Sequence, residues 1–194
     1  NDAAMDRRNS MLGQQQRDWL KASLLGSVAT WNVLAQQVMM AMVAFREEDG
    51  IPQHSMDQWP GYTAERMELM RFLQDRKVPN PVVLTGDIHS NWVNELRVDD
   101  RKTETPVVAS EFVCTSISSG GNGMATVPQL EERLAANPCV RFFNAQRGYV
   151  RCKVTPKVWQ SDYQVVEEVT RPGAPVITKG SFVVEAGRPG IQPA

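Results

Sequence analysis

A short apolar run in the middle of the chain restricts its fold more than any other feature. Val82–Thr85 is too short for a helix and is bounded by Pro81 and Gly86. Such a run is typical of a strand that is buried on both faces. The chain must therefore place packed layers on either side of this strand. Directly after it come the polar and flexible residues of Gly86–His89.

Helices are expected early in the chain and β structure late. The apolar spacing predicts helices at Leu12–Leu25, Thr63–Asp75 and Leu130–Ala136, the last after capping-box spacing at Thr126–Gln129, and a surface turn at Glu47–Pro52. Strands are expected at Trp31–Ala35, Val38–Phe45, Val82–Thr85, Trp92–Val98, Val107–Thr115, Val140–Phe143, Tyr149–Val154, Val158–Val169 and Ser181–Val184. This order predicts an α/β protein of the α+β type, with stacked sheets, outer helices and a β-rich C-terminal part.

Composition excludes several classes of protein. The 194 residues fit one domain or a large piece of one, and 42% hydrophobic content is globular. With 21 Lys and Arg against 22 Asp and Glu, the chain carries a formal charge of -1. We therefore expect neither nucleic acid nor an anionic membrane surface as the main partner. The longest apolar run, Val38–Phe45, is far shorter than the roughly 20 residues of a membrane-spanning helix.

The three cysteines leave two interpretations open. Cys114, Cys139 and Cys152 are too few for a disulfide framework and form no CxxC zinc pattern. If Val140–Phe143 and Gly148–Val154 pair as a hairpin, Cys139 lies opposite Cys152, at a spacing that allows a disulfide. The alternative is a pair of half-buried thiols.

The residues after the central run are candidates for metal binding. In extended backbone, Asp87 and His89 point the same way, so both can reach one ion beyond the strand end. The same spacing also fits a loop-capping Asp87 and an ordinary polar His89. A serine-protease-like triad is excluded, because Ser90 is too close in sequence to both residues and no G-x-S-x-G motif occurs.

Other polar residues are weaker candidates for substrate binding or metal ligation. The loop Ser116–Gly123 is rich in hydroxyls and glycines that suit a phosphate, but it also fits a flexible surface loop. Within it Ser118, and before it Asn91, are the candidate substrate contacts; Asn91 is equally explained as a polar residue where a strand begins. We assign the remaining candidates to the fold: a surface position for His54, and pairing with carboxylates or carbonyls for Arg66 and Arg147.

The segment Thr85–Trp92 resembles the strand-end metal motif of the PhoD-like alkaline phosphatases and phosphodiesterases, a branch of the metallophosphoesterases. Other segments resemble the same family in the same order: Leu12–Leu20, Trp31–Met39, Asp57–Arg66, Glu111–Ser116, Arg147–Tyr149 and Phe182–Gly190. The resemblance implies part of a four-layer α-β-β-α sandwich. It also implies Fe³⁺ and Ca²⁺ as cofactors, Asp87 and His89 as metal ligands, and a metal-bound hydroxide that attacks a phosphate ester.

The resemblance further implies that the active site is incomplete in this chain. The family's other metal ligands precede the matched region, and Cys114 follows the wrong motif to be the iron-binding cysteine. Residues 1–194 are thus expected to be the C-terminal part of the catalytic domain, partnered by an N-terminal part that is separate or cleaved. The tract Met39–Phe45 is either core or the surface that receives that part. A periplasmic or secreted location is expected from the family.

Alternatives to this assignment are a phospholipase D-type phosphodiesterase of the same family and a non-catalytic, β-rich association module.

Overall fold

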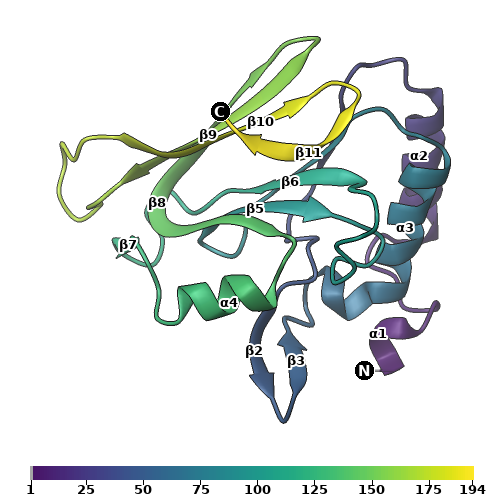
Figure 1. Ribbon diagram of the computed structural model, residues 1–194, viewed down its shortest axis with the longest axis horizontal. Coiled ribbons are helices and arrows are strands. Elements are labelled where there is room, and N and C mark those ends of the chain that lie inside the picture. The colour runs from purple at the N-terminus through teal and green to yellow at the C-terminus, as the bar shows by residue number, and fades with distance from the viewer. Residues whose placement is uncertain (1) are drawn as a thin grey trace.

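The computed structural model describes residues 2–194 (Figure 1). The helices are α1 (Asp2–Met5), α2 (Gly13–Gly26), α3 (Thr63–Asp75) and α4 (Leu130–Ala136), with the 3-10 helix η1 (Trp59–Tyr62). The strands are β1 (Asn32–Ala35), β2 (Ala44–Glu48), β3 (Ile51–His54), β4 (Pro81–Thr85), β5 (Asn91–Leu96), β6 (Ala109–Val113), β7 (Gly123–Met124), β8 (Val140–Val154), β9 (Val158–Val166), β10 (Ile177–Glu185) and β11 (Arg188–Pro193). Over these residues, no helix combines the length and apolar content that crossing a bilayer requires.

One mixed sheet organises the molecule. Its strands run in the order β1-β4-β6-β5-β8-β9-β10-β11, and β7 pairs with β8 outside this path. The pairs β1–β4 and β4–β6 are parallel, and the other pairs of the sheet are antiparallel. Strands β2 and β3 form a separate hairpin, which projects from one end of the molecule (Figure 1).

Strand β8 turns this single sheet into two layers. Its first half pairs with β5 and its second half with β9, and between the two halves the strand curves, so that β9–β11 fold back over β5 and β6 (Figure 1). Gly148 lies where β8 begins to pair with β9, and a Cβ there would lie only 1.9 Å from the backbone oxygen of Gln164. Only glycine allows this approach of the two strands.

The two faces of the sheet have separate apolar cores. Residues of α2 and α3, including Leu24, Met70 and Leu73, pack with Val83 of β4 on one face. On the other face, the core is made by the buried side chains Val82, Val93, Phe112, Trp159, Tyr163, Phe182 and Val184. The alternation of Val82 and Val83 confirms a strand buried on both sides. The resulting layers of helix, sheet and sheet confirm the α+β class and the β-rich C-terminal part.

Several local predictions are confirmed. Helix α3 has the predicted bounds, α2 is shifted by one residue, and the strands around Val82, Val93 and Phe112 differ from the prediction only at their ends. Helix α4 also has the predicted bounds, but the capping box is wrong, because Gln129 stands at the N-cap position with φ 56° and makes no side-chain cap bond. The predicted surface turn is the hairpin β2–β3, which turns at Asp49 and Gly50.

The predicted strand Val38–Phe45 is wrong over most of its length. Met39, Met40, Ala41 and Val43 are buried, but the backbone enters a strand only at Ala44. The amides of Met40 and Ala41 donate to the carboxylate of Glu111 at 2.6 and 3.0 Å instead of to a neighbouring strand. A buried side chain thus replaces the β ladder. This tract is core and not a surface that receives another part of the protein.

The predicted hairpin between Val140–Phe143 and Gly148–Val154 is also wrong. Both segments belong to the one continuous strand β8, so Cys139 precedes one end of this strand and Cys152 lies near the other. Cys139 is buried, Cys152 is exposed, and both thiols are free. The two thiols are therefore unpaired, as the alternative predicts, but neither is half-buried: Cys139 is more buried and Cys152 more exposed than expected.

Candidate functional site

The turn Gly86–His89 begins where β4 ends. The amide of Gly86 donates to the backbone oxygen of Gln37 at 3.1 Å, and the amide of Ile88 donates back to Gly86 at 2.8 Å. Asp87 has φ 69° and His89 has φ 55°, each at a cost of roughly 1–2 kcal/mol for a residue with a side chain. The predicted extended backbone is therefore wrong, and strand alternation does not set the orientation of Asp87 and His89.

The side chains of Asp87 and His89 have no partner in the described part of the chain. Both residues are exposed, and neither side chain takes part in a hydrogen bond or ion pair within residues 2–194. The carboxylate and the imidazole are thus available to external groups. Two strained residues with unpaired side chains, two positions apart, are an unusual combination for a turn that serves only the fold.

Asn91 lies two residues further on but has a different environment. It is 1% exposed, its Oδ1 accepts the amide of Thr115 at 3.0 Å, and its Nδ2 donates to Asn144 Oδ1 at 3.4 Å. These bonds join the start of β5 to the loop after β6 and to β8. The side-chain amide of Asn91 therefore orients backbone in the fold, and direct contact with a substrate stays a prediction.

The loop Ser116–Gly123 lies beside His89. A Cβ on Gly120 would lie 3.9 Å from Nδ1 of His89, an ordinary contact distance, so the backbone of Gly120 passes next to the imidazole. Ser116 Oγ donates to the backbone oxygen of Ser119 at 2.8 Å and closes the loop on itself. Ser118 is exposed on this loop. The tertiary structure thus joins two segments that the sequence presented as separate candidates.

Arg147 connects these two segments. Its guanidinium donates to the backbone oxygen of His89 at 2.6 Å and to those of Gly121 and Gly120 at 3.0 and 3.2 Å. The prediction that Arg147 pairs with carboxylates or carbonyls is confirmed, and its partners are mainly backbone carbonyls. Which carbonyls these are was not readable from the sequence, because the partners lie 26 to 58 positions away.

The described residues do not complete a metal site. Within residues 2–194, no group of three or more His, Cys, Asp and Glu side chains is placed to hold an ion. His54 is half-buried, with Nδ1 3.0 Å from the backbone oxygen of Val43. Cys114 is half-buried, and burial raises the pKa of its thiol, which disfavours the thiolate that binds metals. Two ligands alone leave most of the coordination shell open.

Comparison with known proteins identifies the family. The model of the PhoD-like phosphatase family matches residues 1–163. The chain belongs to the PhoD-like phosphatase family. Alkaline phosphatase D of Bacillus subtilis (strain 168) is 43% identical over 191 residues, which are 98% of this chain and 33% of the relative. A solved structure described as "Structure of PhoD" matches all of this chain and 37% of its own, with a TM-score of 0.94 and 42% identity.

This PhoD-like chain spans about a third of the length of the curated relative that it matches, and it corresponds to the C-terminal part of that relative. The match to the solved structure also confirms the mixed, β-rich architecture. Membership of a phosphatase family accords with a turn that offers a carboxylate and an imidazole beside a glycine-rich loop.

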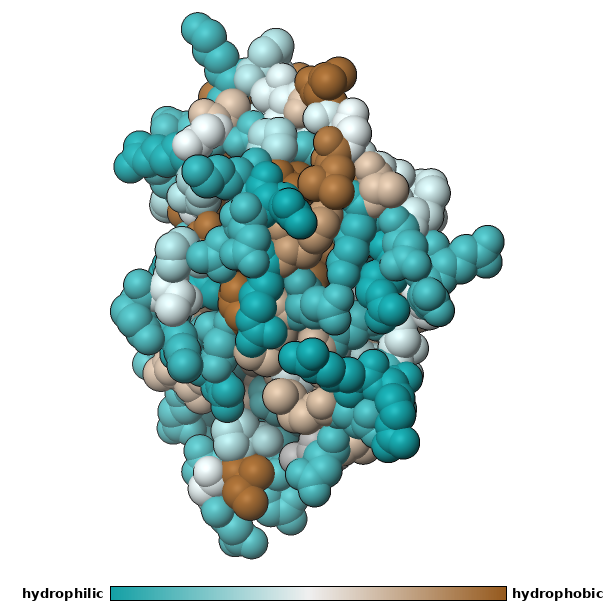
Figure 2. Space-filling model, turned by 90° about the vertical axis from the view of Figure 1, so that its right-hand side faces the viewer, coloured by the Kyte–Doolittle hydropathy of each residue, from teal (hydrophilic) through white to brown (hydrophobic). Residues whose placement is uncertain are grey.

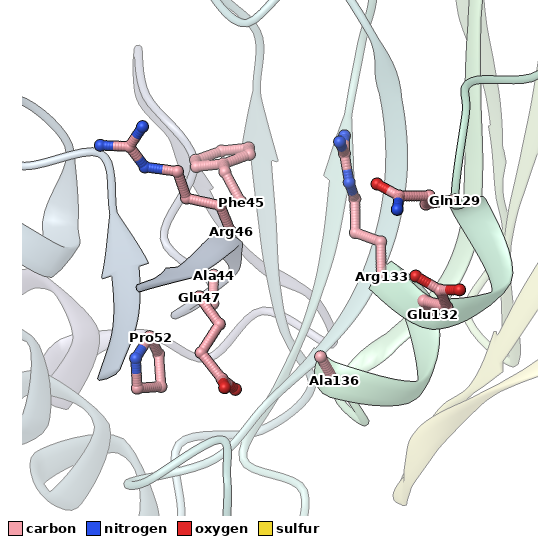
Figure 3. Close-up of a pocket in the computed structure, with 9 residues that line it drawn as sticks. All are labelled: Ala44, Phe45, Arg46, Glu47, Pro52, Gln129, Glu132, Arg133 and Ala136. Carbon is pink, nitrogen blue, oxygen red and sulfur yellow. The ribbon is translucent and has the colours of Figure 1, made fainter. Parts of the chain in front are cut away.

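The cavity in Figure 3 lies apart from this turn. It measures about 570 Å³, lies between the β2–β3 hairpin and α4, and is lined by neither Asp87 nor His89. Its charged lining residues are two arginines and two glutamates: Arg46, Arg133, Glu47 and Glu132. The charges balance, so the cavity does not select strongly for a phosphate.

Proposed function

We propose that this chain supplies one part of the active site of a metal-dependent phosphoesterase. The observation that carries the proposal is the pair Asp87 and His89, which is exposed and unpartnered in a strained turn at the end of a buried strand. Membership of the PhoD-like phosphatase family supports the reaction class. The preferred substrates are phosphomonoesters or phosphodiesters.

The donor atoms of this pair suit the metals proposed for the site. A carboxylate oxygen and an imidazole nitrogen together fit a transition metal such as Fe³⁺, and the carboxylate also fits Ca²⁺. Both side chains are free of competing bonds within the described residues, so no internal contact has to break. The donor set therefore fits Fe³⁺ and Ca²⁺, and Asp87 and His89 are the residues of this chain that would hold them.

Each part of the site has a distinct role in this proposal. When bound, the metals supply Lewis-acid polarisation of the phosphoryl group and lower the pKa of water. Asp87 contributes negative charge that offsets the cations, and His89 contributes a neutral nitrogen ligand. The loop Ser116–Gly123 presents amides and hydroxyls, including the exposed Ser118, to the phosphate oxygens. Asn91 keeps this loop beside the turn through its bond to Thr115.

The remaining ligands are proposed to come from an N-terminal part of the same enzyme, as a separate or cleaved polypeptide. This accords with the share of the curated relative that the chain matches, 33%. A periplasmic or secreted location is proposed by analogy with the family. A phospholipase D-type activity on phosphodiesters and a non-catalytic association role are the alternatives that an experiment has to separate.

The decisive experiment compares Asp87→Asn and His89→Ala with the unchanged protein in the complete assembly. We expect a loss of bound iron and calcium by elemental analysis, and a fall of about 100-fold or more in hydrolysis of p-nitrophenyl phosphate and bis(p-nitrophenyl) phosphate. Asp49→Asn is the matched control, because Asp49 is also exposed and has φ 52°. It should keep both metals and activity.

The outcomes separate the alternatives. Unchanged metal content and turnover in Asp87→Asn and His89→Ala would remove both residues from the site. A protein without metal or turnover that still binds the N-terminal part would favour the association module. Faster turnover of the diester than of the monoester, with release of headgroups from phospholipid vesicles, would favour the phospholipase D-type activity.

A further inference from the structure

Arg147 is a buried arginine with no carboxylate partner among the residues that the structure describes. It is 7% exposed, and it takes part in no ion pair within residues 2–194. Burying a charge without a counterion is costly unless hydrogen bonds to the group compensate for the lost water. Each of the three side-chain nitrogens of Arg147 donates at least once: Nη1 to His89 O (2.6 Å), Ala145 O (3.3 Å) and Thr115 Oγ1 (3.4 Å), Nε to Gly121 O (3.0 Å) and Nη2 to Gly120 O (3.2 Å).

These contacts join the turn of His89 to the loop of Gly120 and Gly121. Nη2 of Arg147 and Nδ1 of His89 lie 3.0 and 3.9 Å from the point that a Gly120 Cβ would occupy. A side chain at position 120 would therefore press on the guanidinium and approach the imidazole. The neighbouring Gly148 adds a second link, since its amide donates to the backbone oxygen of Ser116 at 3.1 Å.

The shape of the side chain explains why arginine stands at this position. A guanidinium presents several N–H groups in a rigid plane, so one side chain can hold three backbone oxygens in a set arrangement. A lysine has one rotatable ammonium group and cannot span the same acceptors. Because His89 has φ 55°, the turn needs outside contacts to keep its strained conformation, and the bond from Arg147 to the His89 carbonyl is one of them.

We propose that Arg147 is a positioning residue that holds the His89 turn and the Ser116–Gly123 loop as one rigid unit. This inference rests on the proposed function: it adds that the imidazole is oriented before the metal binds and that the loop is held at a set place beside it. Arg147 itself is enclosed by protein carbonyls and acts through His89 and the loop, not by contact with the phosphate.

The test compares Arg147→Lys with the unchanged, complete protein. Hydrogen exchange followed by mass spectrometry should show at least tenfold faster exchange in peptides that cover residues 86–91 and 116–123, with peptides from β4 and α3 unchanged. Affinity for iron, measured by competition with a chelator, should fall about 10- to 100-fold. Arg151→Lys is the matched control, because Arg151 lies on the same strand, is exposed and pairs with Asp162 at 2.9 Å, away from the turn and the loop. It should change neither measurement.

Three results would overturn the inference: unchanged exchange in both segments, faster exchange spread evenly over the sheet, or local loosening with unchanged iron affinity. If Arg147→Lys does not fold, Gly120→Ala gives a second test, since it displaces the loop while Arg147 remains, and it should produce the same local pattern. Asp87→Asn, measured in parallel, separates the two proposals. If it retains iron, the proposed function fails; if it loses iron while Arg147→Lys retains it, only the role of Arg147 fails.

Discussion

Two groups of polar and ionisable residues contrast in this chain. Arg66 is fully buried and donates to Asp100 at 2.5 Å and to the backbone oxygens of Met40 and Arg97 at 2.6 and 3.1 Å. Asp87 and His89, in contrast, are exposed and unpartnered within residues 2–194. In the first group every charge is satisfied by the chain itself. In the second, the chain leaves the binding capacity of both side chains unused.

This contrast shows which signal marks function here. Burial raises the pKa of Glu111 to about 7, although bonds from the amides of Met40 and Ala41 and from the side chain of Asn94 lower it. A search for perturbed pKa values would therefore select Glu111. Its partners show instead that it holds the buried tract around Met40 in place. The turn of Asp87 is marked by backbone strain and by unpaired side chains.

The largest effect on the free energy of unfolding is expected at the buried ion pair of Arg66 and Asp100. Arg66→Met should lower the free energy of unfolding by about 3–5 kcal/mol, because the carboxylate of Asp100 then stays buried without its cation. Arg101→Met is the control: Arg101 pairs with Asp99 on the surface, so its loss should cost less than about 1 kcal/mol. Urea unfolding measures both. If Arg66→Met lowers the free energy of unfolding by less than about 1 kcal/mol, the buried pair of Arg66 and Asp100 contributes no more than an exposed ion pair.

A chelator should affect the site of Asp87 and His89 and leave the buried pair of Arg66 and Asp100 unchanged. Removing metals from the complete protein should lower the free energy of unfolding by about 2–3 kcal/mol, if the metals were present at about 100 times their dissociation constant. Asp87→Asn should show little of this shift, because the carboxylate ligand is gone. Thermal unfolding with and without chelator measures the difference. An equal shift in both proteins would mean that the metals bind elsewhere.

Removing the backbone strain at His89 should raise the free energy of unfolding by a smaller amount. His89→Gly should stabilise the metal-free protein by about 1 kcal/mol, because glycine adopts positive φ without steric cost, while metal binding is lost. Lys77→Gly is the matched control, since Lys77 has φ 49° just after α3. It should stabilise the protein similarly and keep the metals. A destabilised His89→Gly would show that the imidazole supports the fold.

The smallest effect on stability is expected from protonation of Glu95 at low pH. Burial alone would raise the pKa of Glu95, but hydrogen bonds from Arg141 and the Ile191 amide, with the charges of Arg141 and Arg97, outweigh burial and lower the pKa below 4.5. The unfolded chain therefore binds a proton more readily, so this stabilisation is present above pH 4.5 and is lost as pH falls through the folded-state pKa. Glu95→Gln should flatten this part of the stability–pH curve. An unchanged slope would show that Glu95 does not contribute.

Local patterns predicted much of the fold and the position of the candidate site in the sequence, at the end of β4. Helix α3 has its predicted bounds because its apolar residues recur at helical spacing, and the alternation of Val82 and Val83 reflects burial on both faces. Asp87 and His89 follow the end of the same strand in the sequence. Such features depend on neighbours within a few residues, so the sequence by itself determined them.

Contacts between distant segments decided the rest. The continuity of β8 depends on pairing with both β5 and β9, and the conformation of Met39–Val43 depends on the carboxylate of Glu111. The link from Arg147 to the His89 turn spans 58 positions. Hydrogen bonds form between groups that the folded chain brings together, whatever their separation in sequence. Only the tertiary structure could therefore show that an arginine on β8 holds the turn that carries His89.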